Sequence, residues 1–105
     1  MNLMEINYLK KKVESGSQLG ARFSFEKNGH IYWSSVGLQK WVDVYKVYID
    51  EIKEKNMAKE EYEREETNSF QSLDDALSFI ELTTQCKLSD LIPCKGQKVF
   101  NPRFE

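Results

Sequence analysis

Apolar residues recur at helical spacing in two stretches of the chain. In the first, residues 2–14, they are three, three and four positions apart, which places them on one helical face: Leu3, Ile6, Leu9 and Val13. Gly16 follows and suits the left-handed position at which many helices end. We therefore predict an N-terminal helix that stops just before Gly16.

The second helix is predicted over residues 73–83. The hydroxyl of Ser72 can accept a hydrogen bond from the amide of Asp75, and both Asp74 and Asp75 stand in the first turn, where the helix dipole favours negative charge. The apolar positions that follow keep helical spacing: Leu73, Ala76, Leu77 and Ile80.

Between these helices, the segments RFSFE and HIYWS alternate between apolar and polar residues on either side of the turn sequence KNG, which predicts a β-hairpin. A two-residue Asn-Gly turn would pair Phe25 with Tyr32. A three-residue loop would pair Phe25 with Ile31 and Phe23 with Trp33, with all four side chains on one face. Because register follows the hydrophobic pattern, we predict the three-residue loop.

Residues 36–39 are expected to be a connection. Residues 41–50 are rich in β-branched and aromatic side chains and favour a strand, although a helix would also align Trp41 with Tyr45 and Tyr48. Apolar side chains on both faces of this strand indicate a central position in a sheet, or an outer face that meets a partner.

The remaining segments are predicted to complete the sheet. Residues 59–67 favour a further strand, joined to the previous one by a hairpin around Asn56, with a solvated helix as the alternative. Residues 90–93 read as a short turn packed on the core, and residues 97–100 as a short closing strand.

Together these elements predict an α+β fold: an antiparallel β-meander of about four strands, with the N-terminal helix and the helix of the C-terminal half packed on it. A chain of 105 residues buries about two-thirds of its unfolded surface, which is enough for one core, so a single domain over residues 1–105 is expected. A content of 40% apolar and 30% charged residues is typical of a folded, soluble domain.

Residue types that catalysis and metal binding require are sparse. The glycines form no phosphate-binding motif, and the only histidine, His30, lies beside the predicted turn without partner groups around it. Cys86 and Cys94 do not have the spacing of a zinc pair, and in a reducing compartment they are expected to be free thiols. We therefore expect no enzyme activity, no metal and no cofactor.

Charge and hydropathy argue against two classes of partner, nucleic acid and membrane. A net charge of −2 and a pI near 5.5 oppose a domain built to coat nucleic acid. Glu5 and Asn7 interrupt the apolar residues at the N-terminus, unlike a signal peptide, and no stretch approaches the roughly 18 apolar residues of a membrane helix. A cytoplasmic protein that contacts neither nucleic acid nor membrane is expected.

Two segments carry a family resemblance. FQSLDDALSFI (residues 70–80) and KGQKVFNP (residues 95–102) resemble the strand–helix and closing elements of small bacterial immunity proteins. The similarity is greatest to those that protect cells from polymorphic toxins, including contact-dependent growth inhibition systems. The similarity covers about the last two-thirds of the chain and lies in the general character of these segments, without a shared motif. No family binding residue is therefore carried over to a position here.

The resemblance implies a protein that binds one cognate toxin domain and blocks its active site or another surface that it needs. Many such toxins are nucleases with basic clefts, which would fit an acidic surface with aromatic anchors. A non-catalytic adaptor or regulatory subunit of a cytosolic complex is the alternative, and a small-molecule enzyme comes third.

Negative charge is concentrated in residues 50–66, which hold eight acidic and four basic residues. A charge run of this kind is most often a solvated face, and each tyrosine is at least as well explained by packing as by binding. The acidic and aromatic residues expected to contact the partner are Trp41, Tyr45, Tyr48, Asp50, Glu51, Glu54, Glu60, Glu61, Tyr62, Glu63, Glu65 and Glu66.

Overall fold

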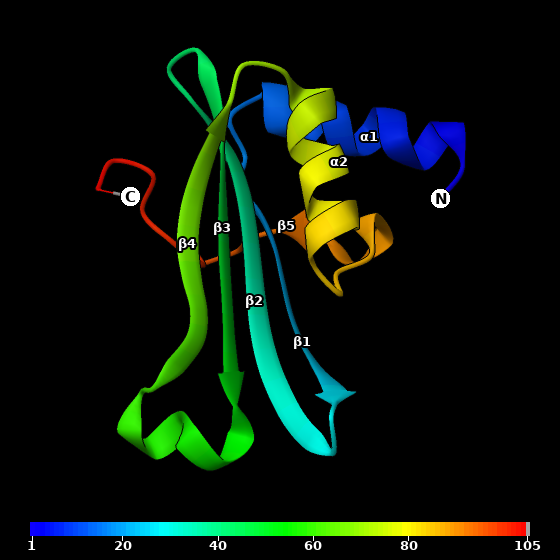
Figure 1. Cartoon of the computed structure of the whole chain (residues 1–105). Coiled ribbons are helices and arrows are strands. Elements are labelled where there is room, and N and C mark those ends of the chain that lie inside the picture. Colours follow the sequence, from blue (N-terminus) through cyan, green and yellow to red (C-terminus); the bar gives the residue numbers. More distant parts are fainter. Residues whose placement is uncertain (105) are drawn as a thin grey trace.

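Five strands form one antiparallel sheet in the order β4-β3-β2-β1-β5, and both α-helices lie on the same face of it (Figure 1). The computed structural model describes residues 1–104. Its elements, with η marking a 3-10 helix, are α1 (Leu3–Glu14), β1 (Leu19–Lys27), β2 (His30–Trp41), β3 (Val44–Lys53), η1 (Glu54–Lys59), β4 (Tyr62–Phe70), α2 (Leu73–Thr83), η2 (Leu88–Asp90) and β5 (Ile92–Pro93). The α+β prediction is confirmed, with five strands in place of about four.

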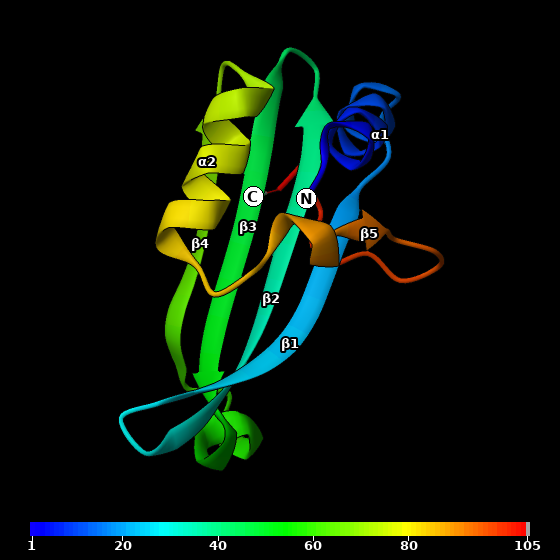
Figure 2. The same ribbon diagram turned by 90° about the vertical axis from the view of Figure 1, so that its right-hand side faces the viewer.

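The hydrophobic core lies between the helices and the sheet. Its buried side chains are Leu9, Val13, Leu19, Val36, Leu38, Val47, Ile49, Leu73, Ala76, Leu77, Ile80, Cys86, Leu88 and Leu91. The helices cover only part of the sheet, and the β1–β2 hairpin extends beyond them (Figure 2). No helix within residues 1–104 combines the length and apolar character needed to cross a membrane.

Both helix predictions are confirmed, because local signals define them. Gly16 takes φ = 96° directly after α1, as the left-handed end position requires. The Ser72 hydroxyl accepts the Asp75 amide at 3.1 Å and begins α2 where predicted. The apolar face of α1 is buried only in its second half, since Leu3 remains 74% exposed.

The predicted register of the first hairpin is wrong. The turn has two residues, Asn28 and Gly29, and Phe25 pairs with Tyr32. Asn28 (φ 52°) and Gly29 (φ 77°) both adopt the positive φ angles that a type I′ turn requires, so turn geometry prevailed over the alignment of apolar side chains. As a result Trp33 points to the face opposite Phe25 and the helices.

Strand boundaries further along also differ from the prediction. Strand β2 continues to Trp41, so residues 36–39 lie inside a strand and are not a connection. The chain reverses at residues 42–43, where Val42 has φ = 58°, and Trp41 therefore faces away from Tyr45. The expected strand at 59–67 is β4, shifted to Tyr62–Phe70, and η1 fills the expected hairpin around Asn56. Residues 97–100 form no strand.

Residues 94–102, here called the C-terminal segment, instead cross the face of the sheet away from the helices (Figure 1). Two glycines that are register partners, Gly20 and Gly37, make room for it. A Cβ atom at Gly37 would lie 2.7 Å from the Phe100 ring, and one at Gly20 would lie 2.7 Å from the Val99 side chain. Phe100 is 5% exposed and stacks on Tyr48 with 5.7 Å between ring centroids.

A buried glutamine, Gln18, holds this segment in place. Its Nε2 donates to Gln39 Oε1 at 2.8 Å and to the Phe100 carbonyl at 2.9 Å, while its Oε1 accepts the Val99 amide at 2.8 Å. Farther along, Lys46 Nζ donates to the Pro102 carbonyl at 2.7 Å. The C-terminal segment thus covers the end of this face that lies near the β2–β3 turn.

Candidate functional site

The other end of the same face, near η1, has no such cover. We call this surface the open patch; it consists of Arg22, Trp33, Ser35, Tyr48, Asp50, Ile52, Met57, Tyr62 and Glu65. A hollow of about 400 Å³ lies within it, lined by the side chains of Arg22, Trp33, Asp50 and Tyr62 among others. The open patch is therefore both chemically mixed and recessed.

A β-bulge brings Tyr62 into the open patch. Asp50 pairs with Glu65, and strict alternation along β4 would send Tyr62, three residues earlier, to the helix side. The register shifts between Glu51 and Ile52, so that Tyr62 pairs with Ile52 and shares its face. This irregularity gathers aromatic and acidic groups that the sequence alternation would separate.

Two carboxylates share one hydroxyl at the centre of the patch. The Tyr48 hydroxyl lies 3.1 Å from Asp50 Oδ2 and 2.8 Å from Glu65 Oε2, but it has a single proton to donate. Burial and, secondarily, the charge of Glu65 raise the pKa of Asp50, against the effect of the Ser35 amide, which donates to Asp50 Oδ1 at 2.8 Å. Burial and the same two carboxylates raise the pKa of Tyr48. Like charges directly opposite each other on a sheet destabilise it, so this pair favours a cation beside it.

Exposed aromatic and thioether groups stand around the acids. Trp33, Tyr62 and Met57 are 40%, 44% and 45% exposed. The Trp33 indole donates to Glu54 Oε1 at 3.3 Å, which adds a further carboxylate to the rim. Burial first, and then the nearby carboxylates including Glu60, raise the pKa of Tyr62. Aromatic faces beside carboxylates are the surroundings that a lysine or arginine side chain prefers.

The structure places the predicted contact residues in two groups. The group in or at the rim of the open patch consists of Tyr48, Asp50, Glu54, Glu60, Tyr62 and Glu65. Glu61 is exposed immediately before β4. Trp41 lies instead beside the C-terminal segment, where it lines a hollow with Phe100 and Pro102.

The second group points to the helix side and is held by contacts within the chain. Glu51 and Glu66 both pair with Arg64, with 3.6 Å between Arg64 Nη1 and Glu51 Oε2. Glu63 Oε1 lies 3.5 Å from Lys53 Nζ. The remaining predicted residue, Tyr45, bonds Glu14 and packs against the core. Glu51, Glu63 and Glu66 each form an ion pair with a lysine or arginine of the same chain. Among the ion pairs within residues 1–104, none includes Asp50 or Glu65.

Five open-patch residues were not among the predicted contacts: Arg22, Trp33, Ser35, Ile52 and Met57. The correct hairpin register would have revealed Trp33, because it places that side chain across from Ile52 and away from the helices. No sequence signal indicated Met57, which reaches the patch from η1.

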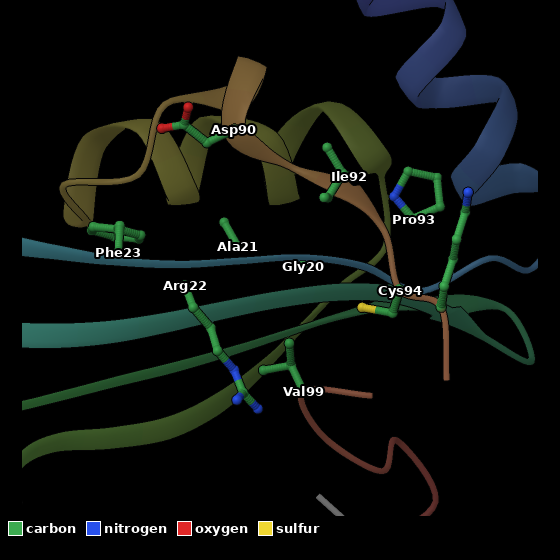
Figure 3. Close-up of a pocket in the computed structure, with 10 residues that line it drawn as sticks. Gly20, Ala21, Arg22, Phe23, Asp90, Ile92, Pro93, Cys94 and Val99 are labelled. Carbon is green, nitrogen blue, oxygen red and sulfur yellow. The ribbon is translucent and has the colours of Figure 1, made fainter. Parts of the chain in front are cut away.

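A larger hollow lies elsewhere, at the point where β5 meets β1. It measures about 750 Å³ and is lined by Ala21, Phe23, Asp90, Ile92 and Cys94 among others (Figure 3). Cys94 is a half-buried free thiol; Cys86 is fully buried, and burial raises its pKa to about 12. Within residues 1–104 no group of three or more histidine, cysteine, aspartate or glutamate side chains could hold a metal ion.

Comparisons with protein-family models, curated proteins and solved structures give no match. The function is therefore inferred from the chemistry of the open patch.

Proposed function

We propose that the chain is a non-catalytic binding protein whose open patch receives a basic side chain of a partner protein, and that it acts as the immunity protein of a bacterial toxin. The observation that carries this proposal is the Asp50–Glu65 pair. The two carboxylates share one hydroxyl, and exposed Trp33 and Tyr62 stand beside them. A basic side chain entering the hollow would relieve their repulsion.

Binding is expected to proceed as follows. The outer carboxylates, Glu54, Glu60 and Glu61, attract a basic surface over a distance and raise the association rate. A lysine or arginine then enters the hollow of about 400 Å³, stacks on Trp33 and meets the carboxylate of Asp50. Aromatic anchors in a recessed site provide most of the affinity of an interface of this kind.

A toxin that cleaves nucleic acid fits this chemistry. Such an enzyme binds phosphates through lysine and arginine side chains, and these are the groups that the open patch is suited to bind. Once the carboxylates of the open patch bind these lysine and arginine side chains, the side chains are no longer free to bind the phosphates of the substrate. An adaptor would use the same surface but leave its partner active, and this difference separates the two candidate functions.

The site itself is tested first, with a defined probe. N-acetyl-arginine amide is titrated into the labelled protein while the indole N–H signal of Trp33 is followed by nuclear magnetic resonance. We expect saturable shifts at Trp33 that weaken several-fold in Asp50→Asn. The matched control is Glu63→Gln, which removes a carboxylate from the other side of the sheet. Equal shifts with N-acetyl-glutamine amide, or no loss in Asp50→Asn, would contradict recognition of a cation by the patch.

The immunity function is tested by capture and inhibition. Tagged wild-type protein, Asp50→Asn and Glu63→Gln are used to capture partners from the native cytosol at low and moderate salt. We expect one stoichiometric partner, retained by wild type and Glu63→Gln and released from Asp50→Asn, whose nuclease or other toxic activity is abolished in the complex. A partner that stays fully active in the complex would refute inhibition and support the adaptor.

A further inference from the structure

Most of the outer edge of β1 is unpaired in the part of the chain that the structure describes. Strand β5 pairs only with Leu19 and Gly20, and the Cys94 amide donates to the Gln18 carbonyl at 2.8 Å. The segment that precedes β5 does not continue along β1 beyond Gly20, and this leaves the hollow of about 750 Å³ beside β1 (Figure 3). The edge from Ala21 to Lys27 therefore has no neighbouring strand.

The turn of the first hairpin determines which backbone groups face outward. Because Asn28 and Gly29 form a two-residue turn, Lys27 and His30 are the closing hydrogen-bonded pair, and odd-numbered residues of β1 bond to β2. Gln18 is even-numbered, and its carbonyl faces outward to accept the Cys94 amide, which agrees with this assignment. The N–H and C=O groups of the even-numbered residues, Arg22, Ser24 and Glu26, thus point away from the sheet.

The two edges of the sheet differ in how they are protected. Strand β4, the other edge, carries a register shift and is dense in acidic side chains, both of which discourage pairing with a second copy of itself. Along β1, Arg22 and Glu26 carry opposite charges and stand at equal distances from Ser24 on the same face. Alternate side chains of this edge strand, Phe23 and Phe25, are apolar and half-buried.

We propose that two copies of this chain associate through β1, antiparallel about a twofold axis at Ser24, to form one continuous sheet. In this register Arg22 of each copy lies opposite Glu26 of the other, and Ser24 lies opposite its own counterpart. On the other face Phe23 lies opposite Phe25 of the second copy. Outward-facing residues meet only outward-facing residues, so the backbone hydrogen bonds of an antiparallel ladder can form.

Other symmetric registers fit less well. An axis at Glu26 would place two Glu26 carboxylates opposite each other, which is unfavourable. An axis at Arg22 would place two guanidinium groups opposite each other and would run the second strand past Gly20, where β5 pairs. With the axis at Ser24 the second strand ends at its Lys27, opposite Ala21, one residue short of the β5 pairing. An axis at Phe23 would bring Glu26 beside Gly20, where β5 pairs, and an axis at Phe25 would place Glu26 opposite Ser24 and form no ion pair. The axis at Ser24 is the register that pairs Arg22 with Glu26.

The interface is short, and short interfaces form weak complexes, so association is measured by sedimentation velocity between roughly 10 µM and 1 mM protein. We expect a concentration-dependent dimer for wild type. Arg22→Glu alone and Glu26→Arg alone should each weaken it about tenfold, since two attractive pairs become repulsive. The double variant R22E/E26R restores both pairs and should restore the dimer. A monomer throughout the range, or a double variant as weak as the single ones, would overturn the proposal.

A cross-linking experiment tests the axis directly. Ser24→Cys should form an intermolecular disulfide on mild oxidation, because Cα atoms of a hydrogen-bonded pair lie about 5.5 Å apart, within disulfide range. Ser69→Cys is the matched control, an exposed serine on the same face of the other edge strand. Cross-linking of Ser69→Cys as fast as Ser24→Cys would refute the register. Neither readout involves a partner, so failure here leaves the proposed function intact.

Discussion

The substitution Gln18→Leu tests whether one buried side chain holds the C-terminal segment on the sheet. Leucine has a similar size, but it offers no hydrogen bond to the Val99 amide, the Phe100 carbonyl or the Gln39 side chain. Gln18 is 4% exposed, so water does not readily take its place while the segment stays docked. These three polar groups are then left without their partner, and the Phe100 amide loses a longer hydrogen bond of 3.4 Å to Gln18 Oε1.

The magnitude follows from these three groups. An unsatisfied buried polar group costs about 1–3 kcal/mol, so the low end for three groups is about 3 kcal/mol. For a domain of this size 1 kcal/mol lowers Tm by about 4–8 °C, and a fall of about 12–24 °C is expected. Release of the segment relieves the unsatisfied groups but exposes Phe100, so the native state is weakened by either route.

Urea unfolding followed by far-ultraviolet circular dichroism measures the loss of stability, and hydrogen exchange at the Val99 amide reports release of the segment. The matched control is Gln97→Leu, an exposed glutamine in the same segment, for which a change within about 0.5 kcal/mol is expected. A loss under about 1 kcal/mol for Gln18→Leu, with the Val99 amide as protected as in wild type, would refute the role assigned to Gln18.

Three further predictions concern the same face. Because the pKa of Asp50 is raised, the carboxylate costs stability as pH rises through that pKa; Asp50→Asn should therefore be more stable than wild type at pH 7, by up to about 1 kcal/mol, with the difference shrinking in acid. Urea titrations at pH 7 and pH 3 check this, and a less stable variant at pH 7 would contradict it. Trp33→Ala should cost under about 2 kcal/mol, below the range for a core tryptophan, because the indole is 40% exposed; a thermal melt showing 3–5 kcal/mol would place it in the core. Gly37→Ala should cost about 1–3 kcal/mol, because its Cβ would lie 2.7 Å from the Phe100 ring, and an unchanged melting curve would show that the ring moves aside freely.

Elements with local signals were predictable from the sequence. Helix α2 begins at its Ser72 cap and keeps the predicted bounds, and Gly16 ends α1 in the left-handed conformation. The hairpin also has a local signal, Asn28-Gly29, and the chemistry of this turn decides the register against the alignment of apolar side chains. With the register set by this turn, Phe25 and Trp33 lie on opposite faces of the sheet.

Features that depend on distant residues were not predictable in this way. The bulge that brings Tyr62 beside Asp50 breaks the alternation from which faces are read. Residues 97–100 have the composition of a strand, yet they cross the sheet because Gln18 supplies the hydrogen bonds that a neighbouring strand would provide. The candidate site was therefore foreseen in its acidic and tyrosine content, and its arrangement depends on long-range packing.

The contact between Gln18 and the Phe100 carbonyl joins residues 82 positions apart in the chain. Strands β1 to β4 follow one another through short connections, whereas this contact closes a loop of 82 residues and carries the greater entropic cost. If the four long strands and α2 assemble before this contact closes, one face of the sheet is bare along its whole length. The C-terminal segment covers one end of that face, and its position sets the boundary of the open patch at that end. Without the segment in place this face would be longer, and it would include the trough over Gly20 and Gly37 that Val99 and Phe100 fill.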